Sequence, residues 1–179
     1  MLKDGEVIQL VGANRRDEAL AEILRAYRRK VFGLAYSFVR NRETAEDVAQ
    51  EVFIKVWRAL AAYDGRAALS TWIYTITRNT SLSALRDRRG GLQTEDDAVL
   101  AEVQEGDTGS AEMAAERAFL LRLVGQLPDK QRQVVLLFYM QDQSLEEVAA
   151  MLAMPLGTVK TLLHRARVQL AAVAGVPAT

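Results

Sequence analysis

The stretch SLEEVAAMLAMPLGTVKTLLHRAR, residues 144–167, predicts two helices separated by a tight turn. Ser144 and Glu147 have the spacing of a capping box, so a first helix is expected over residues 145–152. The tripeptide AMP then forms the turn, and a second helix is expected over residues 156–173. Two helices joined by so short a turn are typical of a helix-turn-helix unit.

The second of these helices has two different faces. One is apolar at three- and four-residue spacing and is formed by Val159, Leu163, Ala166, Leu170 and Val173. The opposite face is polar or basic and is formed by Thr158, Lys160, Thr161, His164, Arg165 and Arg167. A helix with one packed face and one cationic face suits a reader of the DNA major groove. Alternatively, this helix has only a structural role and its basic face is simply exposed to solvent. The capped helix before the turn favours DNA binding.

Helical spacing of apolar residues continues through most of the chain, and no segment alternates as a strand would. Thr44 and Asp47 have capping-box spacing, which predicts that one helix starts at Thr44. Further helices are expected over residues 4–12, 17–39, 44–60, 69–88, 112–126 and 129–141. The predicted fold class is therefore all-α.

Charge divides the chain, although its formal net charge is zero. The net charge is −1 over residues 1–14, +6 over residues 15–89, −8 over residues 90–116 and +3 over residues 117–179. Like charges repel one another, so the acidic part is expected to be an extended linker. The expected organisation is one small helical domain over residues 1–89, an acidic linker over residues 90–112 and a second domain over residues 113–179.

Several classes of function are excluded by composition. The chain has no cysteine and only one histidine, His164, which excludes disulfides, thiolate metal sites and multi-histidine centres. A Gly-rich phosphate loop and an activated nucleophile are also missing, so we expect no enzyme, no metal and no cofactor. No apolar run approaches the roughly 18 residues of a membrane span, and residues 1–6 lack a signal-peptide core. We expect a cytoplasmic protein without direct membrane insertion.

A second basic cluster ends the first charged block. Residues 70–89 begin with Trp72 and Tyr74 and end with several arginines, among them Arg86. Cations neutralise phosphates and aromatic rings stack on unpaired bases, so this segment suits nucleic-acid binding. Core packing is the alternative role of both aromatic residues, and the sequence leaves the two open.

Three segments together resemble the sigma-70 family of bacterial RNA polymerase sigma factors. AEDVAQEVFIKVW, residues 45–57, resembles part of region two, and TWIYTITRN, residues 71–79, resembles its continuation. Leu127-Pro128, VVLL at residues 134–137 and the helix-turn-helix unit resemble region four. The segments follow the family's order, and the length allows no extra domains of housekeeping sigma factors. The chain is therefore similar to the two-domain extracytoplasmic-function (ECF) class.

The resemblance implies a non-catalytic specificity subunit that directs core polymerase to promoters. The implied partners are the beta-prime and beta subunits of core RNA polymerase, promoter DNA and an anti-sigma factor, which in this family is often membrane-anchored. The implied core-polymerase contacts are Asp47, Gln50, Glu51 and Trp57. The implied minus-ten contacts are Asp64, Arg66, Ser70, Trp72, Arg78, Asn79 and Arg86. The implied minus-thirty-five contacts are Thr158, Lys160, Thr161, His164, Arg165 and Arg167.

Three positions depart from the common family pattern. Thr75 and Leu162 stand where basic residues are frequent, and Ser83 stands where aspartate is frequent. Fewer phosphate contacts and an altered promoter choice are the expected consequences. A stand-alone helix-turn-helix regulator is the alternative function; it would need a dimer interface or ligand domain, and a core-polymerase pull-down separates the two hypotheses.

Overall fold

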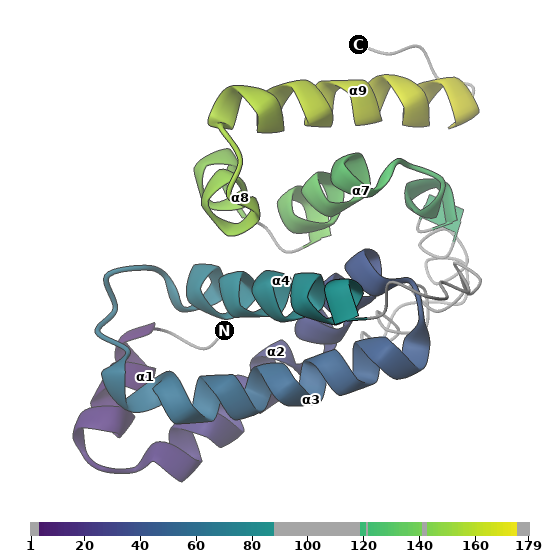
Figure 1. Cartoon of the computed structure of the whole chain (residues 1–179). Helices are drawn as coiled ribbons and strands as arrows, with labels where there is room; N and C mark the ends of the chain where they lie inside the picture. Colours follow the sequence, from purple (N-terminus) through teal and green to yellow (C-terminus); the bar gives the residue numbers. More distant parts are fainter. Residues whose placement is uncertain (1–3, 88–118, 121, 141–142, 175–179) are drawn as a thin grey trace.

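Helices account for every regular element in residues 4–87, 119–120, 122–140 and 143–174, which the computed structural model describes (Figure 1). The N-terminal half contains α1 (Asp4–Gly12), α2 (Arg16–Val39), α3 (Arg42–Ala59), the short 3₁₀ helix η1 (Leu60–Ala62) and α4 (Leu69–Asp87). The C-terminal half contains α7 (Asp129–Val135), the π-helix η2 (Leu136–Met140), α8 (Leu145–Leu152) and α9 (Leu156–Ala174). These elements confirm the all-α prediction, whereas the predicted linker over residues 90–112 lies outside the described residues.

The N-terminal half is a bundle in which α2, α3 and α4 pack on one another. On α3, the apolar residues at four-residue spacing, Val48, Val52 and Val56, are all buried. Ile23 from α2 and Ile73 from α4 are fully buried against them in the same core. Burial of each such side chain stabilises the fold by about 1.5–3 kcal/mol, so these residues are the main source of stability in the bundle.

The start of α3 differs from the prediction. The N-cap is Asn41, whose side-chain oxygen accepts hydrogen bonds from the Thr44 backbone N–H at 2.9 Å and from the Thr44 hydroxyl at 2.6 Å. Thr44 is itself buried at the third helical position, so the predicted capping box of Thr44 and Asp47 was wrong. Asparagine is among the strongest N-cap residues, and here its side chain accepts from the backbone N–H of Thr44, the residue predicted to be the cap.

The helix-turn-helix unit forms as predicted. The Ser144 side chain accepts from the Glu147 backbone N–H, and the Glu147 carboxylate accepts from the Ser144 backbone N–H at 2.8 Å. Helix α8 ends at Leu152, and its C-cap Ala153 has a left-handed backbone (φ 50°) that turns the chain into α9. The helix expected over residues 129–141 differs, because its α-helical part ends at Val135 and continues as the wider π-helix η2.

The two halves of the molecule are in contact. Helix α8 packs against α4, and α7 packs against the end of α2 (Figure 1). Arg132 of α7 is 1% exposed, and its guanidinium donates to the Ser37 carbonyl of α2 at 2.9 Å and to the Leu127 carbonyl at 3.2 Å. The same group pairs with the Asp129 carboxylate at 2.7 Å. A buried guanidinium therefore bridges the halves at this contact.

Candidate nucleic-acid interface

Helix α9 presents the polar face that the sequence predicted. Val159, Leu163 and Ala166 are buried against the other helices of the C-terminal half. The six predicted minus-thirty-five residues are all exposed: Thr158, Lys160, Thr161, His164, Arg165 and Arg167. Val173 does not belong to the buried stripe, because its side chain is 55% exposed. The packed face of α9 is thus shorter than predicted, and the basic face is available along the helix.

Two of these polar residues are held by neighbouring groups. The Arg167 guanidinium donates to the Tyr139 hydroxyl at 2.6 Å and lies over that ring, 5.6 Å from its centroid. The Thr161 hydroxyl donates to the Gly157 carbonyl at 2.9 Å. Arg167 is therefore oriented by η2, while Lys160 and Arg165 extend from the exposed face.

The loop between η1 and α4, residues 63–68, is folded tightly on its neighbours. The Tyr63 ring is buried and stacks on Trp72 at a centroid distance of 4.9 Å, and its hydroxyl donates to the Ala67 carbonyl at 2.9 Å. Burial, with the negative charge of Asp4, raises the pKa of Tyr63 to about 12, so this hydroxyl stays a neutral donor. Asp64 and Arg66 form an exposed ion pair at 3.0 Å.

The structure separates the roles of the two aromatic residues that the sequence left open. Tyr74 is fully buried and contacts Tyr27 edge-on at a centroid distance of 6.0 Å, so it belongs to the core. Trp72 is half-buried, with its ring stacked on Tyr63 beside the loop. Only Trp72 remains a candidate for contact with an unpaired base.

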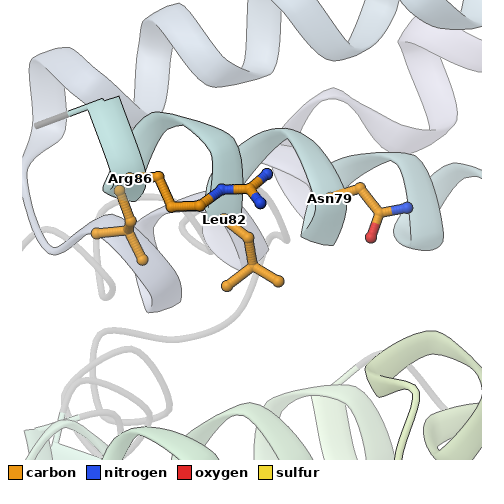
Figure 2. Close-up of a pocket in the computed structure, with 4 residues that line it drawn as sticks. Asn79, Leu82 and Arg86 are labelled. Carbon is orange, nitrogen blue, oxygen red and sulfur yellow. The ribbon is translucent and has the colours of Figure 1, made fainter.

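The remaining minus-ten candidates lie along α4. Asn79 and Arg86 line a cavity of about 450 Å³ together with Leu82 and Leu85. Figure 2 shows Asn79 and Leu82 projecting from α4 on the side of the C-terminal half. The Arg78 guanidinium donates to the Asn79 side-chain oxygen at 3.0 Å.

One further minus-ten candidate is in direct contact with the C-terminal half. The Ser70 hydroxyl donates to the Gln143 side-chain oxygen at 3.1 Å, across the junction of α4 and α8. In the described arrangement the C-terminal half therefore covers part of the α4 surface that was predicted to face DNA.

The predicted polymerase contacts share α3 but do not form one cluster. Asp47 and Glu51 are exposed, and Glu51 pairs with Lys55 at 2.7 Å. Gln50 instead lines a groove of about 850 Å³ between α2 and α3. The Trp57 ring is covered by the Arg16 guanidinium, which lies 5.2 Å from its centroid.

The groove between α2 and α3 contains residues that sequence reasoning missed. Ile54 is 50% exposed there and stands beside Phe53, while Arg28 and Arg29 of α2 contribute positive charge. One signal was present in the sequence: Ile54 lies outside the apolar stripe of α3 and yet is apolar. An apolar floor with a charged rim is typical of a protein–protein interface.

Comparison with known proteins defines the class of this fold and site. Residues 23–90 match the family model of Sigma-70 region 2, and residues 119–170 match that of Sigma-70 region 4. The chain belongs to the sigma-70 family, and it is a non-catalytic specificity subunit of RNA polymerase.

The sequence relatives of this chain show to which class of the sigma-70 family it belongs. The chain is 32% identical over 163 residues to the ECF RNA polymerase sigma factor SigW of Bacillus subtilis, covering 84% of this chain and 86% of that protein. It is 34% identical over 151 residues to the ECF RNA polymerase sigma-E factor of Escherichia coli K12, covering 79% and 78% of the two chains. This is therefore a sigma factor of the ECF class.

Solved structures confirm the fold. CnrH in complex with the cytosolic domain of CnrY superposes with a TM-score of 0.63 at 23% identity, covering 94% of each chain. RpoE of Bartonella quintana in complex with the anti-sigma factor NepR gives a TM-score of 0.64 at 22% identity, covering 87% of this chain and 96% of the other.

Within the described part of the chain, no helix is long and apolar enough to cross a membrane. The same residues contain no group of three or more side chains suited to hold a metal ion.

Proposed function

We propose that this ECF sigma factor reads a promoter with two separate surfaces. The exposed face of α9 binds the minus-thirty-five duplex through the major groove, with Arg165 as the base-reading residue. The surface formed by residues 63–68 and α4 holds the unwound minus-ten strand, with Asn79 and Trp72 nearest to the bases. The observation that carries the proposal is the α9 face, where six polar or basic residues are exposed on a capped helix-turn-helix unit.

Opening the duplex costs a few kilocalories per mole for each extruded base. A surface that stacks or hydrogen-bonds an extruded base offsets that cost, and Trp72, Arg78 and Arg86 supply a ring and two cations beside Asn79. The strand is held rather than cleaved, so the chemistry of transcription belongs to the polymerase. The acidic segment over residues 90–112 joins the two readers in this proposal.

The cytoplasm is the proposed location, since core polymerase and promoter DNA are there. An anti-sigma factor is the proposed regulator, since one of the superposable structures above is a complex of a sigma factor with an anti-sigma factor. Such a partner would prevent access to core polymerase or to DNA. The absence of cysteine places any thiol-based sensing in the partner.

The α3 surface is the proposed contact with the beta-prime subunit of core polymerase. Asp47→Arg, or the pair Gln50→Ala with Glu51→Ala, is expected to weaken core-polymerase binding about tenfold while the thermal unfolding curve stays unchanged. The three side chains are exposed, so their loss costs little folding stability. Pull-down with purified core polymerase measures the effect, and Glu43→Ala on the same helix is the matched exposed control. Normal binding by the first two variants would place the docking surface elsewhere.

Two residues of α9 are expected to behave differently towards the minus-thirty-five element. Arg165→Ala should reduce discrimination between promoter sequences by about 1–3 kcal/mol, because a side chain on a base edge reads sequence. Lys160→Ala should weaken binding to all sequences alike and lower the salt slope by about 1, as the loss of a phosphate contact does.

The experiment is holoenzyme binding to a set of minus-thirty-five variants at several salt concentrations. His164→Ala is a companion variant on the same exposed face, and it shows whether the imidazole reads a base as well. If Arg165→Ala and Lys160→Ala lower affinity equally for every sequence, α9 does not read bases through Arg165.

A further inference from the structure

Helix α1 lies beside the loop that joins the α3–η1 segment to α4 (Figure 1). Residues 4–12 precede the segment matched to Sigma-70 region 2, which begins at residue 23. Val7 is fully buried and anchors this helix on the core of the N-terminal half. Helix α1 is therefore held in place next to the loop by its own packing on the core.

The first contact is at the beginning of α4. The Asp4 carboxylate accepts a hydrogen bond from the Leu69 backbone N–H at 2.9 Å, across 65 positions of sequence. The first N–H groups of a helix lack partners within the helix, and a negative charge is favoured at that end. Ala68 precedes α4 and has no side-chain acceptor, so the cap of α4 is supplied from α1.

The second contact is at the turn of the loop. Gly65 has a left-handed backbone with φ 73°, a conformation that residues other than glycine rarely adopt. A Cβ atom at this position would lie 2.6 Å from the Ile8 Cδ1 atom, so α1 touches the loop backbone directly. The loop is thereby contacted by Ile8 at Gly65, and its first residue, Tyr63, stacks on Trp72 of α4.

We propose that α1 is a positioning element for the minus-ten reader, and that Asp4 is its principal positioning residue. Asp4 fixes the first turn of α4, and Ile8 fixes the turn at Gly65. Together they set how Asp64, Arg66 and Trp72 are presented to the unwound strand. This inference rests on the proposed function of the loop. It adds Asp4 and Ile8, which affect DNA binding by positioning the loop and the first turn of α4.

The test uses holoenzyme reconstituted from core polymerase and the full chain. Its probe is a single-stranded oligonucleotide that carries the non-template minus-ten element, and binding is measured by fluorescence anisotropy. Asp4→Ala should weaken oligonucleotide binding about fivefold, which corresponds to the loss of one helix cap of about 1 kcal/mol. Asp4→Asn retains a side-chain oxygen and should recover most of the affinity. Glu6→Ala removes the same charge from an exposed position of α1 and should bind as wild type does.

Two further measurements separate positioning from loss of folding. Core-polymerase affinity and minus-thirty-five discrimination should be unchanged in Asp4→Ala, because the Asp4 carboxylate accepts its hydrogen bond from α4 rather than from α3 or α9. Ile8→Ala removes a side chain that is 37% exposed, so it should remain folded and bind the oligonucleotide about twofold more weakly.

The outcomes are distinct. Wild-type binding by Asp4→Ala, or an equal loss of polymerase affinity and oligonucleotide binding, overturns the positioning role alone. If the wild-type holoenzyme itself does not bind the minus-ten strand, the proposed function of the loop fails and the positioning role fails with it.

Discussion

Replacing Arg132 by alanine is expected to lower the free energy of unfolding by about 3 kcal/mol. The guanidinium is 1% exposed and donates to the Ser37 and Leu127 carbonyls, so its removal leaves buried acceptors without this donor. Each buried polar group that loses its partner costs about 1–3 kcal/mol. Asp129 is mostly exposed, and water replaces its share of the ion pair. Urea denaturation followed by circular dichroism measures the change.

Two variants control this prediction. Arg122→Ala removes an exposed arginine from the same half and should change stability by less than about 0.5 kcal/mol. Arg132→Lys keeps the charge but loses the planar fork that reaches several acceptors, so an intermediate loss is expected. Coincident unfolding curves for Arg132→Ala and wild type would show that the bridge between α7 and α2 contributes nothing to stability.

Local signals were sufficient to predict most helices. A repeat of 3.6 residues and a capping box both act within one or two turns, so the sequence alone contains them. Ser144 and Glu147 formed the predicted capping box. At α3 two acceptors were available within four residues, and Asn41 took the position assigned to Thr44. The spacing of residues in the sequence does not show which of two possible N-cap residues caps the helix.

Contacts between distant segments could not be predicted. Arg132 is one of several charged residues in a helical stretch, and its partner Ser37 is 95 positions away. The Asp4 cap of α4 and the contact of Ile8 with Gly65 also depend on how α1 packs against the loop. No pattern in the sequence identifies these residues, because their partners come close only when the chain has folded.

The two surfaces proposed to bind DNA were predictable to different extents. The α9 residues were found together because one amphipathic helix carries them all, and the structure exposes all six. The minus-ten candidates are spread over a loop and five turns of α4, and their placement depends on tertiary contacts. The hydrogen bond from Ser70 to Gln143 shows that the C-terminal half faces part of that surface, which the sequence did not indicate.

The isolated chain is expected to bind promoter DNA only weakly. Its basic segments have net charges of +6 and +3, and the acidic segment with −8 competes with DNA for them. The contact between α8 and α4 also places Asn79 and Ser70 on the side of the C-terminal half. Few phosphate contacts give affinities in the nonspecific range, with Kd of about 10⁻⁶–10⁻⁴ M at physiological salt. The holoenzyme should bind its promoter at least about 10³-fold more tightly.

The most direct test compares the free chain, core polymerase and the reconstituted holoenzyme on one promoter fragment and on a scrambled fragment of equal length. Binding and run-off transcription are measured at the same physiological salt concentration. The prediction is that only the holoenzyme distinguishes the promoter from the scrambled fragment and produces a run-off transcript of the expected length. Tight, promoter-specific binding by the free chain, with no transcript when core polymerase is added, would contradict a specificity subunit and support a stand-alone regulator.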